Sequence, residues 1–308
     1  MRTALFRALN QNVRPHVGLG LARTLFFALA ITASGAWAQQ PKPAAKAGKP
    51  PAPQARVTIA INEGGAANAD AAETLFRFEE VTQLLERELH APLVAVSVRD
   101  RNKLKASLKK REYGLLLARP NDVPAEAIRD FGYRPVVVAK EPAQALFIVH
   151  KNSPLRTIND VKGRTIVTPD QYSNMWRIAN AMLRDAHIDM TRESVKSMRD
   201  QAAIGWSMEN EFFDVGVVNA LSGVGRSWEK NGHRVIARSR PTPNMPLIAS
   251  PQITDTQEAA IRTALIKLSE SDQGRAALKK IGLSGFQPTS REEFLDFLKW
   301  LGDLEAGL

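Results

Sequence analysis

Residues 152–167 read NSPLRTINDVKGRTIV, and this stretch combines a short helical turn with a strand. Asp160 lies where the predicted turn ends, and Gly163 can adopt the positive φ that stops a helix without steric cost. The β-branched run Thr165–Val167 then predicts a buried strand. The local pattern is therefore a helical turn followed at once by a strand.

The same alternation extends in both directions along the chain. The β-branched run 57–61 predicts a strand that leads into a turn, and apolar residues then recur at helical spacing over 75–89. Further strands are predicted at 94–98, 113–117, 136–139, 146–150, 165–167, 194–197, 215–218, 235–237 and 247–250. Further helices are predicted at 101–110, 174–186, 200–210, 221–231, 255–270, 272–281 and 291–303. Strands separated by helices indicate the α/β class, with mostly parallel sheets that helices flank.

Two extended stretches without helices, 135–150 and 235–250, divide this series of elements. The predicted elements also spread over more residues than one small core usually holds. Both features are expected if the chain crosses twice between two lobes. We therefore expect a first lobe of residues 56–140 and 248–308, and a second lobe of residues 141–247.

The N-terminal segment has the order of an export signal. Four arginines precede the apolar run 25–31, and small residues ending in Ala36-Trp37-Ala38 follow. The apolar core spans only about ten residues, whereas a membrane-spanning helix needs about 20, so an uncleaved anchor is the less favoured alternative. We expect residues 1–38 to be a signal peptide that is cleaved after Ala38, which releases the protein into the periplasm. The proline- and lysine-rich residues 39–55 predict an extended, disordered linker.

Composition excludes several classes of protein. Of the 308 residues 44% are hydrophobic and 24% are charged, which is typical of a globular chain and not of a disordered one. The net charge is +10, but seven of the 42 basic residues and none of the 32 acidic ones precede Arg56, so 35 basic residues face 32 acidic ones in the remainder. Nucleic-acid binding needs a concentrated basic surface, and we expect none here. The absence of cysteine excludes a disulfide scaffold and a thiolate metal site.

Three segments carry a resemblance to a known family. Residues 152–167 resemble the segment that opens the second lobe of type 2 periplasmic binding proteins, where a serine, a short helical turn, Asp-Leu-Lys-Gly-Lys and a strand recur. Residues 213–218 resemble that family's step into a strand, and residues 271–288 resemble its C-terminal helix and tail. Within the family the chain most resembles the phosphate/phosphite/phosphonate-binding group of ABC transporter components.

The resemblance implies a two-lobed clamp in which two crossing strands join mostly parallel sheets. A small, anionic, phosphonate- or phosphate-like ligand would lie between the lobes, at the carboxyl ends of the strands, and hinge closure would bury it. The implied function is the solute-binding component of an ABC importer, with a membrane permease as partner. The alternative is a periplasmic sensor whose closed form binds a membrane receptor or a histidine kinase. We expect a monomer.

The carboxyl ends of the predicted strands supply the candidate ligand-binding residues. The loop between strand 165–167 and helix 174–186 ends at a helix start, where free N–H groups and the helix dipole favour an anion. It contributes the candidates Thr168, Tyr172, Ser173 and Asn174. The phosphonate-binding group usually has a Ser-x-Ser-Gly-like loop where this chain has Gln-Tyr-Ser-Asn at 171–174, which predicts a pocket of different shape. The alternative is that Ser173 or Asp170 only caps the helix.

Four more candidates follow other strands. Arg119 comes after strand 113–117, where its guanidinium could clamp an anion, although it could equally be a solvated loop residue. Asn62 and Glu63 end the first strand. Glu63 would repel a phosphate but could hold an ammonium, so it indicates either an amine-bearing ligand or a position outside the pocket. Asn219 follows strand 215–218.

Sequence motifs for catalysis are absent. The five histidines are isolated, without a His-Glu-x-x-His motif, so no zinc site is expected. Neither a Gly-x-Ser-x-Gly elbow nor a phosphate-binding glycine loop occurs after the export segment. We therefore expect a protein that is not an enzyme and that uses no metal and no cofactor. An enzyme on this fold is a further alternative, but it would need a catalytic pair that the sequence does not reveal.

Overall fold

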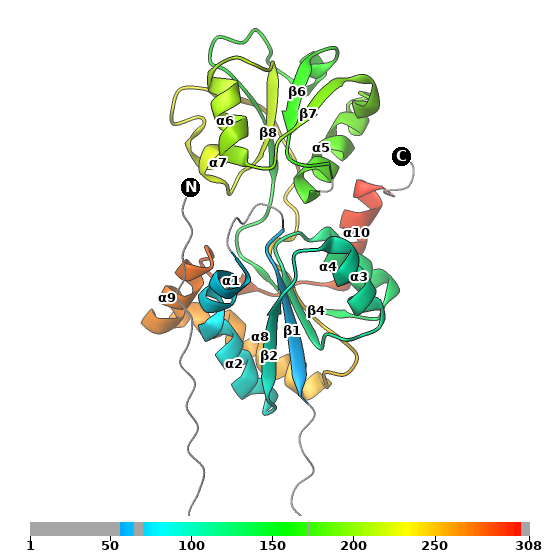
Figure 1. The fold of residues 1–308 in the computed structure, drawn as a ribbon, viewed down its shortest axis with the longest axis vertical. Coiled ribbons are helices and arrows are strands. Elements are labelled where there is room, and N and C mark those ends of the chain that lie inside the picture. The colour runs from blue at the N-terminus through cyan, green and yellow to red at the C-terminus, as the bar shows by residue number, and fades with distance from the viewer. Residues whose placement is uncertain (1–55, 65–69, 172, 303–308) are drawn as a thin grey trace, which may run out of the picture. The chain divides into compact units, whose positions relative to one another are not determined.

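The computed structural model describes residues 56–64, 70–171 and 173–302 (Figure 1). The predicted signal peptide 1–38, the predicted linker 39–55 and the candidate Tyr172 lie outside the described residues. No described helix is both long and apolar enough to span a membrane.

The first sheet has the strand order β11-β4-β10-β3-β1-β2. β1 pairs in parallel with β2 and with β3, and β10 is antiparallel to both β3 and β4, so β1 to β4 all run in one direction. Only β10 and β11 run against them. The strands are β1 (Val57–Asn62), β2 (Leu93–Ser97), β3 (Leu115–Ala118), β4 (Arg134–Ala139), β10 (Leu247–Ala249) and β11 (Phe286–Gln287).

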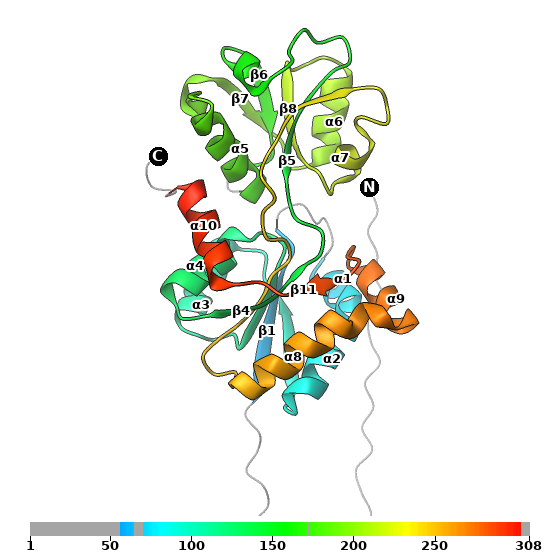
Figure 2. The same cartoon turned by 180° about the vertical axis from the view of Figure 1, so that it is seen from behind.

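Helices cover both faces of this sheet because alternate strand residues point to opposite sides. Ile59 and Leu115 pack with one group of helices, whereas Ala60 and Leu116 pack with another. The first group is α2 (Glu79–Leu89), α8 (Asp255–Lys267) and α9 (Asp272–Lys280), and α1 (Ala71–Arg77) precedes it in the chain. The second group is α3 (Arg101–Lys109), α4 (Asp122–Asp130) and α10 (Arg291–Leu301). Figure 2 shows α8 along the first sheet and α10 beside α4.

The second sheet has the order β7-β6-β8-β5-β9, and only β5 runs against its neighbours. Phe147 and Ile166 face α5 (Asn174–Asp185), whereas Leu146 and Val167 face α6 (Gln201–Glu209), which is followed by α7 (Gly223–Ser227). The strands are β5 (Ala145–Val149), β6 (Thr165–Thr168), β7 (Ser194–Ser197), β8 (Val215–Asn219) and β9 (Arg234–Arg238). We call each sheet with its helices a lobe, the first lobe containing β1 and the second containing β6.

The stretch 152–167 has the conformation that its sequence predicts. A 3-10 turn spans Ile158–Val161, and the Asp160 carboxylate accepts hydrogen bonds from the N–H groups of Arg156 and Thr157 at 2.9 and 2.8 Å. Gly163 has a φ of 76°, which a residue with a side chain would adopt only with strain. β6 follows directly.

Two segments of chain, 140–144 and 239–246, cross between the sheets. Ala143 and Thr242 pair across them through N–H···O bonds of 3.0 and 2.9 Å. The two-lobed α/β class with two crossing strands is therefore confirmed.

Several details differ from the sequence expectation. The apolar spacing over 75–89 belongs to two helices, α1 and α2, and α4 has no counterpart among the predicted ranges. The helix predicted at 221–231 is only the five-residue α7, and the helix predicted at 255–270 ends at Lys267 and continues as a 3-10 turn. The two-residue β11 is too short for any periodic pattern to reveal it.

Candidate functional site

A cavity of about 550 Å³ lies where the carboxyl ends of parallel strands from both sheets meet. Its polar lining comes from residues at or just after the ends of β1, β2, β3, β6, β7 and β8. In open α/β sheets this is the edge where ligands bind, because the loops there are free to vary. The polar lining residues are Asn62, Glu63, Arg99, Arg101, Arg119, Asp170, Ser173, Asn174, Arg199, Asp200, Gln201 and Asn219.

The start of α5 forms one wall of this cavity. Ser173 is the N-cap, and its hydroxyl accepts a hydrogen bond from the Trp176 N–H at 3.2 Å. Asn174, the first residue of the helix, is only 8% exposed, and its buried Oδ1 atom has no hydrogen-bond partner among the described residues. A buried polar atom without a partner is rare in folded proteins and calls for an explanation such as a ligand. The helix start therefore presents backbone N–H groups to the cavity, and Asn174, whose buried Oδ1 atom has no partner among the described residues, lies beside them.

Arg199, just after β7, is exposed at the cavity and makes no hydrogen bond or ion pair with any residue that the structure describes. The other lining arginines differ. Arg101 is paired with Asp122 at 2.7 Å, and Arg119 donates to the carbonyl of Ile281 at 2.9 Å. Arg99 also has an interaction partner. Among the four arginines of this lining, Arg199 is consequently the one whose guanidinium has no partner in the described part of the chain.

Glu63 lines the cavity, but arginines compensate its charge. Its carboxylate accepts a hydrogen bond from Arg77, and Arg119 lies 3.5 Å from its Oε1 atom. The neighbouring Asn62 donates to the carbonyl of Val98 at 2.6 Å and accepts from the Gly64 N–H at 2.9 Å, which fixes the turn after β1. With two guanidinium partners, Glu63 has little remaining attraction for an ammonium group.

Two further candidates occupy different surroundings. Asn219 lines the cavity, and its N–H donates to Gln201 Oε1 at 2.7 Å, which ties the end of β8 to the start of α6. Thr168 is fully buried, with its hydroxyl 3.5 Å from that of Ser197, and it is not among the described residues that line the cavity. Thr168 therefore supports the loop rather than the cavity wall.

Sequence reasoning missed part of the lining. Arg99 follows the predicted strand 94–98 directly, and Arg199 follows the predicted strand 194–197 by two positions. The rule that selected Arg119, a basic residue just after a strand, applies equally to both. A uniform use of that rule would have found them.

A buried ion network lies behind the cavity and joins the two lobes. Arg177 of α5 is 2.9 Å from the Asp122 carboxylate of α4, and Arg101 of α3 contacts the same carboxylate. Glu126 pairs with both arginines. Burial by itself would raise the pKa of Asp122, but the charges of Arg101 and Arg177 outweigh it and hold the pKa of this carboxyl below its usual range.

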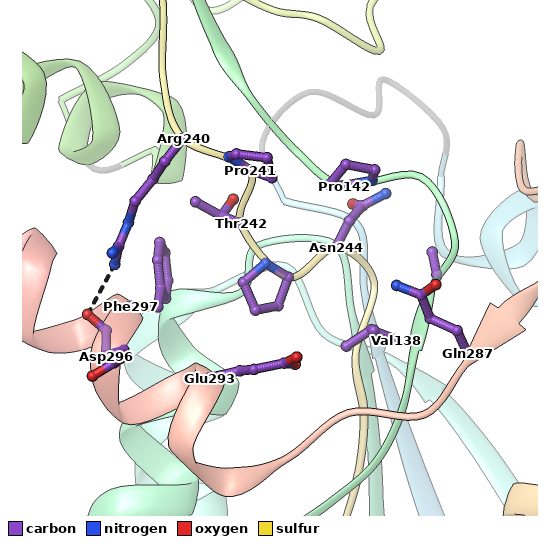
Figure 3. A pocket seen from close by; sticks show the side chains of 12 residues that line it. Val138, Pro142, Arg240, Pro241, Thr242, Asn244, Gln287, Glu293, Asp296 and Phe297 are labelled. Atoms are coloured by element: carbon purple, nitrogen blue, oxygen red, sulfur yellow. Dashed lines mark hydrogen bonds between the residues drawn. The ribbon is translucent and has the colours of Figure 1, made fainter.

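A smaller cavity of about 300 Å³ lies between the crossing segments and α10 (Figure 3). Arg240 points along it and donates to the carbonyl of Asp296 at 2.9 Å, while its guanidinium lies 4.6 Å from the ring centre of Trp300. Glu293 points toward the same space. No residue at the carboxyl ends of β1, β2 or β3 is among the described residues that line this cavity, and its arginine is engaged. The larger cavity is therefore the candidate site.

Neither cavity has the features of a metal centre. Within residues 56–64, 70–171 and 173–302, no three histidine, cysteine or carboxylate side chains are grouped so that they could hold a metal ion.

Comparisons with known proteins agree with this geometry. The family model described as "ABC transporter, phosphonate, periplasmic substrate-binding protein" matches residues 64–294. None of the curated proteins matches the chain in sequence.

Several solved structures share the fold at low sequence identity. XAC2383 from Xanthomonas citri, solved with ATP bound, superposes with a TM-score of 0.65 at 11% identity and covers 80% of this chain and 96% of its own. PhnD1 from Prochlorococcus marinus, solved with methylphosphonate, gives 0.61 at 10% identity over 80% and 96% of the two chains. The phosphonate-transporter binding component PA3383 from Pseudomonas aeruginosa gives 0.57 at 15% identity over 80% and 85%.

Proposed function

Because the chain belongs to the periplasmic substrate-binding family of phosphonate ABC transporters, we propose that it captures a small phosphonate- or phosphate-like oxyanion between its two lobes. Members of this family are solute-binding components of ABC importers and work in the periplasm with a membrane permease. The protein delivers its ligand without a chemical reaction.

One observation carries the proposal. In the cavity at the strand ends, the guanidinium of Arg199 and the Oδ1 atom of Asn174, both without a partner among the described residues, accompany the N-terminal end of α5. The partial positive charge and the free N–H groups at a helix start bind anions, and a guanidinium adds a bidentate, charge-assisted contact. The Asn174 amide can present either its oxygen or its nitrogen to a protonated or ionised oxyanion.

The charge of the lining supports the same ligand class. Four arginines face three carboxylates, and one of these carboxylates, Glu63, is compensated by Arg77 and Arg119. Ser173, Asn62 and Asn219 supply neutral polar groups at the rim. We assign direct ligand contact to these residues together with Arg199 and Arg119, and a supporting role behind the loop to Thr168. Tyr172 belongs to the same loop.

Hinge bending at the crossing segments would close the cavity. We assign residues 56–140 and 248–308 to the first lobe and residues 141–247 to the second. The two crossing segments, which pair at Ala143 and Thr242, connect the lobes. A rotation there would have to keep or rearrange the ion pair between Arg177 of α5 and Asp122 of α4. Closure would bury the ligand and present the closed form to the permease.

A thermal-shift panel of the purified protein tests the proposal. The panel contains phosphate, phosphite, methylphosphonate, alkanesulfonates, carboxylates and amino acids. A ligand at 100 times its Kd adds about 2.7 kcal/mol to the free energy of unfolding, which raises the Tm of a chain of this size by about 5–10 °C. We expect such a shift from a phosphorus oxyanion. A shift caused only by amines or carboxylates contradicts the proposed ligand class.

Arg199→Ala then tests the site. Loss of a charge-assisted contact of about 1.5–3 kcal/mol weakens oxyanion binding by about 10- to 100-fold. Arg192→Ala is the matched control, because Arg192 precedes β7 at the opposite end of the same strand and is exposed. Equal affinities for the two variants would show that the oxyanion binds elsewhere.

A further inference from the structure

One helix of the second lobe, α5, is bonded to the first lobe at two places along its length. The first place is the buried ion network. Arg177 of α5 is 2.9 Å from the Asp122 carboxylate of α4, and its guanidinium also donates to the carbonyl of Gly302, the residue after α10, at 3.2 Å. Both charged side chains are buried. The start of α5, which forms one wall of the candidate cavity, is therefore tied to α4 and to the end of α10.

The second place lies two helical turns further along α5. Arg184 donates to the carbonyl of Trp300, in the last turn of α10, at 2.6 Å, and Asp185 accepts from the indole N–H of the same tryptophan at 2.7 Å. The Trp300 ring also stacks under Arg240 of a crossing segment. Because α10 packs on α4, these bonds reach the first lobe. We call the bonds of Arg177, Arg184 and Asp185 to the first lobe the α5 anchor.

The other side of the second lobe has no such connection. α6 and α7 lie on the opposite face of the second sheet from α5, on the side of the molecule where α1 and α2 cover the first sheet (Figure 1, Figure 2). Both helices pack on β8 and on each other. Within residues 56–64, 70–171 and 173–302, neither α6 nor α7 forms a hydrogen bond or an ion pair with the first lobe. The contact between the lobes is therefore asymmetric.

This asymmetry favours one direction of movement. Separation of α5 from α4 and α10 would deprive Arg177 and Asp122 of each other's charge, and the loss of a partner from a buried ion pair is strongly destabilising. A rotation about the α5 anchor keeps these bonds. It displaces α6 and α7 the most, and no described hydrogen bond or ion pair to the first lobe has to break there.

We propose that α5 and α10 form the pivot of lobe closure, so that the α5 anchor persists with and without ligand while α6 and α7 swing toward α1 and α2. The inference rests on the proposed function, since it assumes that an oxyanion closes the lobes. Arg177, Arg184, Asp185 and Trp300 are then positioning residues, which hold the anion-binding start of α5 against the first lobe before the ligand arrives. Arg199, which precedes α6, travels with the moving side.

Pairs of nitroxide labels test this inference, because a chain without cysteine can be labelled at chosen positions. Asp130→Cys with His187→Cys spans the lobes on the side of α4 and α5, and Gln83→Cys with Glu209→Cys spans them on the side of α2 and α6. All four residues are exposed. Double electron–electron resonance, with and without a saturating phosphorus oxyanion (methylphosphonate or inorganic phosphate), should show a clearly shorter Gln83–Glu209 distance and a much smaller change between 130 and 187. Equal changes in the two distances would overturn the pivot.

A cross-link across the α5 anchor provides a second test. Asp185→Cys and Trp300→Cys place two thiols where the wild-type side chains are in contact, and a short bismaleimide can join them. We expect the same Kd for the oxyanion before and after cross-linking, because a pivot does not open. An affinity about tenfold weaker after cross-linking would contradict the proposal. Thermal melts identify a double variant that fails to fold, and the label distances then decide.

The proposed function and the pivot fail in different ways. If calorimetry shows saturation and the Gln83–Glu209 distance shortens, but the Asp130–His187 distance changes equally, only the pivot is wrong. If the saturated protein shows no change in either distance, closure does not occur and the pivot is wrong with it, whereas oxyanion binding stands. If neither methylphosphonate nor phosphate binds, the oxyanion function is wrong, and so is a pivot for its closure.

Discussion

At the scale of single residues, Asp122 is the carboxyl group that both Arg101 and Arg177 contact in the buried ion network. Its carboxylate is fully buried, yet it stays ionised because Arg101 and Arg177 lie within 2.9 Å. Removal of one charge from such a network leaves its partners buried without compensation, which typically costs about 3–5 kcal/mol. The network therefore contributes to stability as a unit.

Asp122→Asn should lower the free energy of unfolding by about this amount at pH 7, measured by urea denaturation. The pKa of Asp122 is lower in the folded than in the unfolded chain, so its stabilising contribution is present above the unfolded pKa of about 3.9 and is lost as the pH falls through the lower folded value. The difference between wild type and variant should accordingly shrink in strong acid.

The control is Asp255→Asn, since Asp255 is fully exposed. This control should leave the urea midpoint nearly unchanged. Equal effects of the two substitutions at pH 7 would show that Asp122 is not the centre of a buried network.

The sequence could not reveal which charged side chains compensate one another in the folded chain. From the sequence alone, Glu63 is either a ligand for an ammonium group or a residue outside the pocket. In the structure it lines the cavity, and Arg77 and Arg119 compensate its charge. Its partners Arg77 and Arg119 are 14 and 56 positions away in the chain, and only packing brings them together. Thr168 is similar, because its burial beside Ser197 depends on the pairing of β6 with β7.

At the scale of elements, the β-branched strands and the helix caps could be read directly. The helix at 174–185 begins at the predicted residue, because Ser173 supplies the cap oxygen that local sequence already indicates. Short elements such as β11 have too few residues to leave a periodic signal. Local chemistry thus predicts most strands and helices, whereas the contacts between them need the folded chain.

Capping and ligand binding at α5 can be separated by a matched pair of variants. Ser173→Ala and Ser290→Ala each remove an N-cap hydroxyl, which accepts from Trp176 in α5 and from Glu293 in α10. Each should lower stability by about 1 kcal/mol. Only Ser173→Ala should also weaken phosphorus-oxyanion binding, measured by calorimetry, because α5, unlike α10, begins at the candidate cavity. Equal oxyanion affinities in both variants would reduce Ser173 to a helix cap.

At the scale of the whole molecule, the sequence predicts more of the fold than of the candidate site. The alternation of strands and helices, the extended stretches near 140 and 240, and the resemblance of residues 152–167 lead to a two-lobed α/β chain. The location of the site at strand ends follows from that topology. The identity of its free groups does not, because whether Arg119 or Arg199 is available depends on contacts such as the Arg119 bond to Ile281, 162 positions away.

Capture by closure is the central claim of this account, and it requires the lobes to move when the ligand binds. Small-angle X-ray scattering of the purified protein, with and without saturating methylphosphonate, measures this directly. We expect the radius of gyration to decrease on ligand addition in the wild type, and to decrease less in Arg199→Ala at a ligand concentration that only just saturates the wild type. An unchanged radius of gyration in wild-type protein that calorimetry shows to be saturated would contradict the account.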